Sequence, residues 1–99
     1  MAPNNLRIIN GPGPEVMEMI RRRLPPDLRK ELAGRSFNSI ALISANIPGI
    51  CYFADVAQKA GAVLAAELSG TCPQHVTTLA LFGDIAAVQA AVAAIEAAQ

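Results

Sequence analysis

The sequence predicts an α/β protein, of the α+β kind in which helices pack against an antiparallel sheet. Short apolar runs typical of strands alternate with longer runs typical of helices, and glycine and proline turn signals separate them. Hydrophobic residues make up 53% of the chain and charged residues only 16%, which excludes a disordered chain. A length of 99 residues leaves room for a single domain over 1–99.

The N-terminal third, residues 6–34, is expected to hold one strand and two short helices. Leu6–Asn10 is a strand-like run that ends at Gly11-Pro12-Gly13-Pro14, a turn whose last proline suits the first turn of a helix. The helix Pro14–Arg23 carries glutamates near its start and arginines near its end, as the helix dipole favours. Two prolines stop it, and a second helix over Asp27–Ala33 is closed by Gly34.

Residues 38–98 predict a core in the order strand–helix–strand–strand–helix. Asn38–Ala45 is apolar on both alternating faces, which is typical of a central strand. Asn46 is expected to cap the following helix, which has Pro48 in its first turn and ends near Gly61. Two further strands follow, over Ala62–Leu68 and Val76–Phe82.

The last helix is expected to begin at Gly83-Asp84, with Asp84 as its N-cap. Its larger apolar residues lie on one face and are candidates for the core: Ile85, Val88, Val92 and Ile95. Nearly all its other residues are alanine, so a neighbouring backbone or subunit could approach it closely.

This order predicts a ferredoxin-like split βαβ arrangement with one strand displaced. Such a unit needs one more strand after the last helix, and the chain has none there. Leu6–Asn10, at the other end of the chain, is the candidate for that place. The result is a circular permutation, which domains tolerate because their termini tend to lie close together.

Charge and hydropathy exclude several kinds of partner and location. Eight Lys and Arg balance eight Asp and Glu, so neither nucleic acid nor an anionic membrane is attracted by net charge. No run reaches the roughly 18–20 apolar residues of a membrane span, and we expect no signal peptide. We therefore expect a cytoplasmic chain with its two cysteines reduced. So small and apolar a domain leaves hydrophobic surface uncovered, which indicates an obligate oligomer.

No catalytic motif is found. The sequence has no Ser–His–Asp order, no phosphate-binding loop and no zincin helix, so we expect no enzyme. Cys51 is expected to be buried as a small hydrophobe. The run Arg21-Arg22-Arg23 could line an anion site, but charge at the C-terminus of a helix is usually a solvated complement to the helix dipole, and we favour that interpretation.

The stretch from Ile40 to Ala94 resembles the shell domain of bacterial microcompartments, the BMC domain. The matching segments are IALIS, the helix opened by Pro48-Gly49, AQKAGAVLAAEL and LALFGDIAAVQAAVAA. The leading segments RIINGPGPEVMEMI and PPDLRKELAG are similar to those of the circularly permuted shell proteins of propanediol and ethanolamine compartments. The resemblance implies a homohexameric tile that assembles with other shell proteins around encapsulated enzymes, some of them redox enzymes. It also implies that Lys59 lies at the edge between neighbouring hexamers.

The same resemblance places the loop between the last two strands at the central pore of the hexamer. Here that loop is Ser69, Gly70, Thr71, Cys72, Pro73, Gln74 and His75. It is longer than the common glycine-serine-glycine pore loop. Only Met1–Asn5 precede the first strand, so the small barrel that permuted relatives build over the pore is expected to be absent or truncated.

Cys72 is the candidate metal ligand of this loop. A lone Cys-Pro-Gln-His segment is a weak metal motif in one chain, but six-fold symmetry would present six thiols around one axis. Soft thiolates select iron–sulfur clusters or zinc, and a [4Fe–4S] cluster takes four of them. The TCPQH segment is most similar to the iron–sulfur-binding shell proteins of glycyl-radical propanediol compartments. The cluster would transfer electrons or close the pore, and His75 would be a ligand, a hydrogen-bond donor to the cluster site or a solvated side chain.

Three alternatives remain at this point. The pore could be metal-free and pass small polar metabolites, because the rest of the loop is uncharged. A trimeric small-ligand regulator could use the same topology, since one fold hosts many sites. A thiol redox module of Cys51 and Cys72 is disfavoured by their spacing, which fits no CxxC motif.

Overall fold

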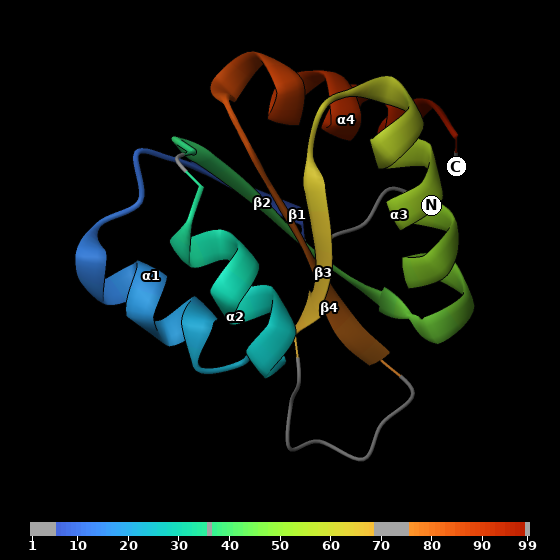
Figure 1. The fold of residues 1–99 in the computed structure, drawn as a ribbon. Helices are drawn as coiled ribbons and strands as arrows, with labels where there is room; N and C mark the ends of the chain where they lie inside the picture. Colours follow the sequence, from blue (N-terminus) through green and yellow to red (C-terminus); the bar gives the residue numbers. More distant parts are fainter. Residues whose placement is uncertain (1–5, 36, 69–75, 99) are drawn as a thin grey trace.

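The computed structural model describes residues 6–35, 37–68 and 76–98 and contains all the expected elements (Figure 1). In chain order they are β1 (Leu6–Asn10), α1 (Pro14–Arg21), α2 (Pro26–Ala33), β2 (Ser39–Asn46), α3 (Ile47–Ala60), β3 (Leu64–Leu68), β4 (Val76–Gly83) and α4 (Ile85–Ala97).

Two element ends differ from the expected ones by two residues. Helix α1 ends at Arg21 instead of Arg23 because the chain tightens there: the Arg23 and Leu24 amides donate to carbonyls three residues back. Leu24 also precedes a proline, and that position disfavours helical backbone. Strand β3 begins at Leu64 instead of Ala62, because a tight turn joins the Val63 amide to the Gly61 carbonyl at 2.9 Å.

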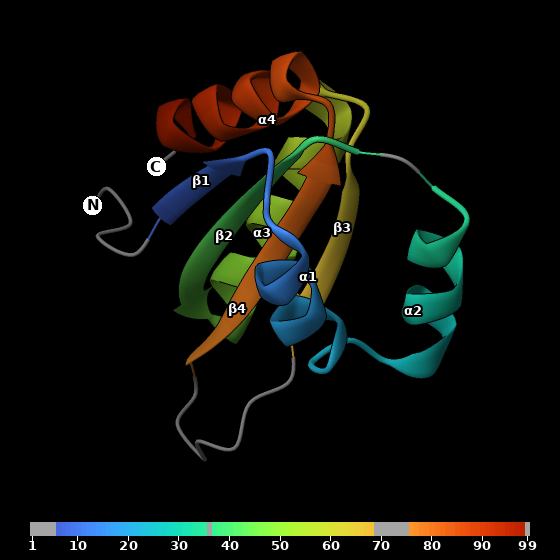
Figure 2. The ribbon, with the colours of Figure 1, turned by 90° about the vertical axis from the view of Figure 1, so that its left-hand side faces the viewer.

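The four described strands form one antiparallel sheet in the order β1-β2-β4-β3. Figure 2 views this sheet nearly face on, with β1 at one edge and β3 at the other. Strand β1 pairs with β2 from Leu6 opposite Ile43 to Asn10 opposite Ser39. The N-terminal strand therefore occupies the edge position that the split βαβ topology leaves open after α4.

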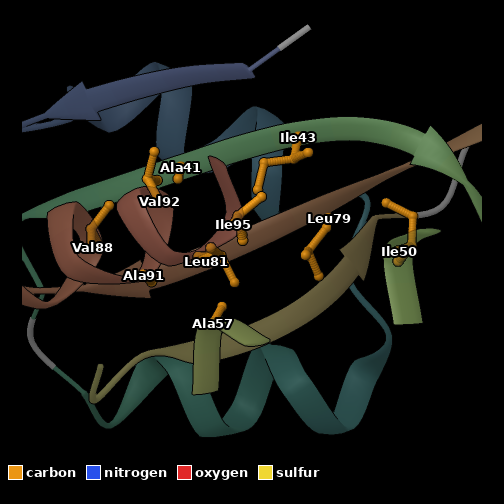
Figure 3. Close-up of a cluster of buried hydrophobic side chains, with 10 residues drawn as sticks. All are labelled: Ala41, Ile43, Ile50, Ala57, Leu79, Leu81, Val88, Ala91, Val92 and Ile95. Carbon is orange, nitrogen blue, oxygen red and sulfur yellow. The ribbon is translucent and has the colours of Figure 1, made fainter. Parts of the chain in front are cut away.

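Helices cover both faces of the sheet, α1 and α2 on one and α3 and α4 on the other (Figure 1). Strand β2 is buried on both sides: Ile40 belongs to the α1/α2 core, while Ala41 and Ile43 belong to the α3/α4 core. The central position expected for this strand is confirmed. Figure 3 shows the α3/α4 core, which is made of Ala41, Ile43, Ile50, Ala57, Leu79, Leu81, Val88, Ala91, Val92 and Ile95.

Helix α4 confirms three of the four expected core residues. Val88, Val92 and Ile95 are buried together with Ala91, whereas Ile85 is 39% exposed. The buried stripe is the i, i+3, i+4, i+7 set that starts at Val88, and it leaves the first turn of the helix at its margin. Because Ala91 is also buried, the centre of the buried face is shifted toward Ala91 and away from Ile85. Ile85 therefore lies at the edge of this face and is partly exposed.

The alanines of α4 permit the close approach that the sequence suggested. A Cβ atom on Gly61 would lie 2.6 Å from the backbone oxygen of Ala87, so the end of α3 nearly touches the α4 backbone. Within the described residues, none of the helices has the length and apolar character needed to cross a membrane.

Candidate functional site: the base of the β3–β4 loop

The candidate pore loop, Ser69–His75, lies outside the described residues, but the structure describes the strands that carry it. Leu68, the last residue of β3, is paired with Thr78 of β4. The Thr77 hydroxyl donates to the Leu68 carbonyl at 3.2 Å and adds a side-chain bond across the same pair of strands. The two ends of the loop are therefore held together on a rigid pair of strands.

The start of α3 lies at the same end of the sheet. Asn46, the last residue of β2, is opposite Val76, the first residue of β4. Its side-chain oxygen accepts from the Gly49 amide at 2.8 Å and caps α3, as the sequence predicted. A Cβ atom on Gly49 would lie 2.9 Å from that oxygen, so the cap uses the space that glycine leaves.

Glu67 is a charged residue at this end that sequence reasoning assigned to no role. It lies one residue before the end of β3 and is exposed, while its neighbours Ala66 and Leu68 are buried. A single acidic residue in an otherwise apolar strand was the signal that could have drawn attention to it. Glu67 brings a negative charge within two residues of a loop that contains no Lys, Arg, Asp or Glu.

Cys51 is exposed, so the expectation of a buried thiol is wrong. The buried residues of α3 are Ile50 and Ala57, two turns apart. Cys51 follows Ile50 by one residue, a rotation of about 100° around the helix axis, and this brings it to the solvent side together with the half-exposed Tyr52. A hydrophobic composition alone therefore does not determine which face of α3 is buried.

Lys59, the candidate edge residue, is exposed near the end of α3. Its ammonium group lies 2.8 Å from a carboxylate oxygen of Asp55, one turn earlier. This hydrogen bond and the attraction of the carboxylate raise the pKa of Lys59 above its usual value of 10.5. The pair holds the Lys59 side chain along the exposed surface of the helix.

The arginine run is solvated, as expected. Arg21, Arg22 and Arg23 are all exposed, and Arg22 lies 3.9 Å from Glu18 on the preceding turn. Across residues 6–35, 37–68 and 76–98, no three His, Cys, Asp or Glu side chains are grouped so as to hold a metal ion.

The comparisons with known proteins agree with this architecture. The family model of the BMC domain matches residues 39–99. The chain is similar to the GrpU microcompartment shell protein from Pectobacterium wasabiae, with 37% identity, a TM-score of 0.76, and coverage of 93% of this chain and 99% of that one. No curated protein matches the chain.

Two more distant structures share the fold. The GrpU microcompartment shell protein from Clostridiales bacterium 1_7_47FAA is 27% identical, with a TM-score of 0.66 and coverage of 92% of this chain and 86% of that one. The trimeric bacterial microcompartment shell protein PduB is 21% identical, with a TM-score of 0.51; 93% of this chain aligns with 37% of that chain. That likeness concerns the fold alone.

Proposed function

The chain belongs to the BMC domain family, and from this premise we propose that six copies form a shell tile whose central pore is lined by Ser69–His75. Members of this family are structural proteins of the microcompartment shell and not enzymes. Family membership sets aside the trimeric small-ligand regulator. We also propose that the tile assembles with other shell proteins and encloses redox enzymes.

The position of β1 in the sheet supports a circularly permuted form of the domain. Strand β1 lies beside β2 at the sheet edge, the place that the split βαβ order leaves for a strand after α4. Leu6 packs against the cluster that contains Val92 and Ile95 of α4. The start of β1 and the C-terminal half of α4 thus contribute to the same core. A short connection from α4 to β1 would convert this chain into the unpermuted order of elements, in which the edge strand follows the last helix.

We propose an iron–sulfur cluster held by Cys72 in the pore. The donor chemistry fits, because thiolates are the ligands of such clusters and a [4Fe–4S] cluster takes four. Each chain has one thiol in the loop, and the described residues of one chain offer no metal site of their own. A [4Fe–4S] cluster held by thiolates alone needs Cys72 from four chains, which a hexamer supplies with two to spare.

The observation that carries this proposal is the closed base of the loop. The Thr77 hydroxyl and the Leu68 carbonyl join β4 to β3 next to the two ends of the loop. Every copy would therefore present Cys72 at the same end of its sheet. Bound there, the cluster would supply one-electron transfer across the tile or closure of the pore. The second candidate, a metal-free pore for small polar metabolites, is favoured by the uncharged loop residues Ser69, Thr71 and Gln74.

Anaerobic purification tests the cluster. We expect coloured protein with about four iron atoms per six chains, and colourless, iron-free protein for Cys72→Ser. Cys51→Ser is the matched control, because it removes the exposed thiol of α3 and leaves the loop intact. Iron-free wild-type protein of hexameric mass would support the metal-free pore instead.

The mass in solution tests the ring itself. Native mass spectrometry is expected to give six chains for the wild type and for Cys72→Ser, because the substitution changes only the loop. A trimer or a monomer would contradict the hexamer and with it the sharing of one cluster by several copies.

A further inference from the structure

An open pocket lies between α1 and the segment that leads from α2 into β2. It has a volume of about 320 Å³, and two arginines border it, Arg21 at the end of α1 and Arg35 two residues after α2. We propose that this pocket binds a carboxylate attached to a small apolar body. The proposal is independent of the pore and of any cluster in it.

The two guanidinium groups have donors to offer. Among the described residues, the Arg21 side chain forms no ion pair or hydrogen bond. Arg35 donates through one nitrogen to Glu31 at 2.8 Å, and both partners of this pair are about half exposed. Exposed pairs one helical turn apart are weak, so Glu31 competes only modestly with an incoming anion.

The lining of the pocket combines polar and apolar groups. Met17 and Phe37 line it beside the arginines. The Phe37 ring packs edge-on against Phe82 of β4, with 5.2 Å between ring centroids, which fixes its position against the core. Two cations and two apolar side chains around one opening are typical of a site for an amphipathic anion, whose apolar part an inorganic ion lacks.

Backbone hydrogen bonds hold the walls in place. The Gly11 amide donates to the Asn38 carbonyl at 2.7 Å, and the Asn38 amide donates to the Gly83 carbonyl at 3.2 Å. Gly11 has φ of +63°, which favours glycine at this turn. The pocket therefore exists before a ligand arrives, and binding orders little except the two arginine side chains.

The distribution of charge favours anions on this side of the sheet. Residues 6–35 contain seven of the eight Lys and Arg but four of the eight Asp and Glu, a net charge of +3; the rest of the chain has −3. Helices α1 and α2 belong to the first segment and α3 and α4 to the second, so the two faces of the sheet carry opposite charge. The positive side raises the local concentration of anionic ligands.

The chemistry specifies the ligand class. A guanidinium group donates two parallel hydrogen bonds to a carboxylate, a geometry that favours this anion. The volume of about 320 Å³ equals that of about ten water molecules and suits a ligand of about ten non-hydrogen atoms. A free organic acid such as benzoate and the terminal carboxylate of a peptide ending in phenylalanine both provide this chemistry.

Titration calorimetry with benzoate at low ionic strength tests the site on the intact oligomer. We expect saturable binding that weakens with added salt, and no binding of benzyl alcohol, which lacks the charge. Arg21→Met and Arg35→Met should each weaken binding by about tenfold or more. Arg22→Met is the matched control: it removes a neighbouring exposed cation that does not line the pocket and should leave the affinity within about twofold.

Three further measurements complete the test. Glu31→Gln frees Arg35 and should tighten benzoate binding. Phosphate should bind at least tenfold more weakly than benzoate, and a phenylalanine-terminated peptide that binds better than both benzoate and its own amide would identify a peptide as the source. The proposal is overturned if wild-type protein does not bind benzoate saturably, if the two arginine variants bind as the wild type does, or if phosphate binds as well as benzoate.

Discussion

Among the described glycines, Gly61 leaves the least room for a side chain. Its missing side chain lets the end of α3 approach the Ala87 carbonyl of α4, where a Cβ atom would meet a backbone oxygen at 2.6 Å. A backbone atom cannot swing away as a flexible side chain does, so the two helices would have to separate.

We expect Gly61→Ala to lower the free energy of unfolding by about 1–3 kcal/mol. Gly34→Ala is the control, since the nearest atom to its added Cβ is 4.0 Å away; there we expect no loss. Chemical denaturation at one fixed protein concentration measures both, because oligomer stability depends on concentration. Equal stability of the two variants would show that the helices are not in close contact at Gly61.

Lys59 allows a prediction on pH. Its pKa is raised in the folded chain by Asp55, so its contribution to stability is complete below pH 10.5 and is lost as the pH rises through the folded pKa. Detection of the ammonium nitrogen by NMR should give a pKa above 10.5 in the wild type and a lower one in Asp55→Asn. An unchanged pKa in Asp55→Asn would exclude this ion pair as the cause.

At the scale of elements, the helix caps connect sequence to structure most directly. Asp84 accepts from the Ala87 amide at 2.8 Å and fixes the start of α4. Asp84→Ala should cost about 1 kcal/mol of stability, whereas Asp84→Ser should retain most of the cap. Thermal unfolding of the two variants measures the difference, and equal transition temperatures would contradict a capping role.

The caps Asn46 and Asp84 were predictable because each depends on residues within one helical turn. The edge position of β1 was also predictable, because the order of the other strands leaves one place open. What failed depends on contacts distant in sequence: the rotation of α4 that exposes Ile85, and the face of α3 that carries Cys51.

The candidate sites divide in the same way. The β3–β4 loop is defined by the two strands that flank it, so the order of elements along the chain is enough to assign Ser69–His75 to it. The pocket of Arg21 and Arg35 could not be found in this way. Those residues are 14 positions apart, on different segments, and only the folded chain brings them to one opening.

For the whole molecule, the edge role of Lys59 remains a prediction about assembly. Lys59→Ala should abolish extended sheets of tiles seen by electron microscopy and leave the mass of the single oligomer unchanged, because the residue is exposed on α3. Lys30→Ala, the other lysine of the chain and also exposed, is the matched control. Normal sheets from Lys59→Ala would place the contact between tiles elsewhere.

The hydrogen bond between the Thr77 hydroxyl and the Leu68 carbonyl marks the boundary between the sheet and the β3–β4 loop. The strands are paired up to the described base of the intervening heptapeptide, where Leu68 lies opposite Thr78. We therefore expect that those seven positions can be exchanged for another sequence while the pairing of Leu68 with Thr78 is kept. On the proposed function, the sequence of the loop would determine what is bound, and the two strands would determine where it is presented.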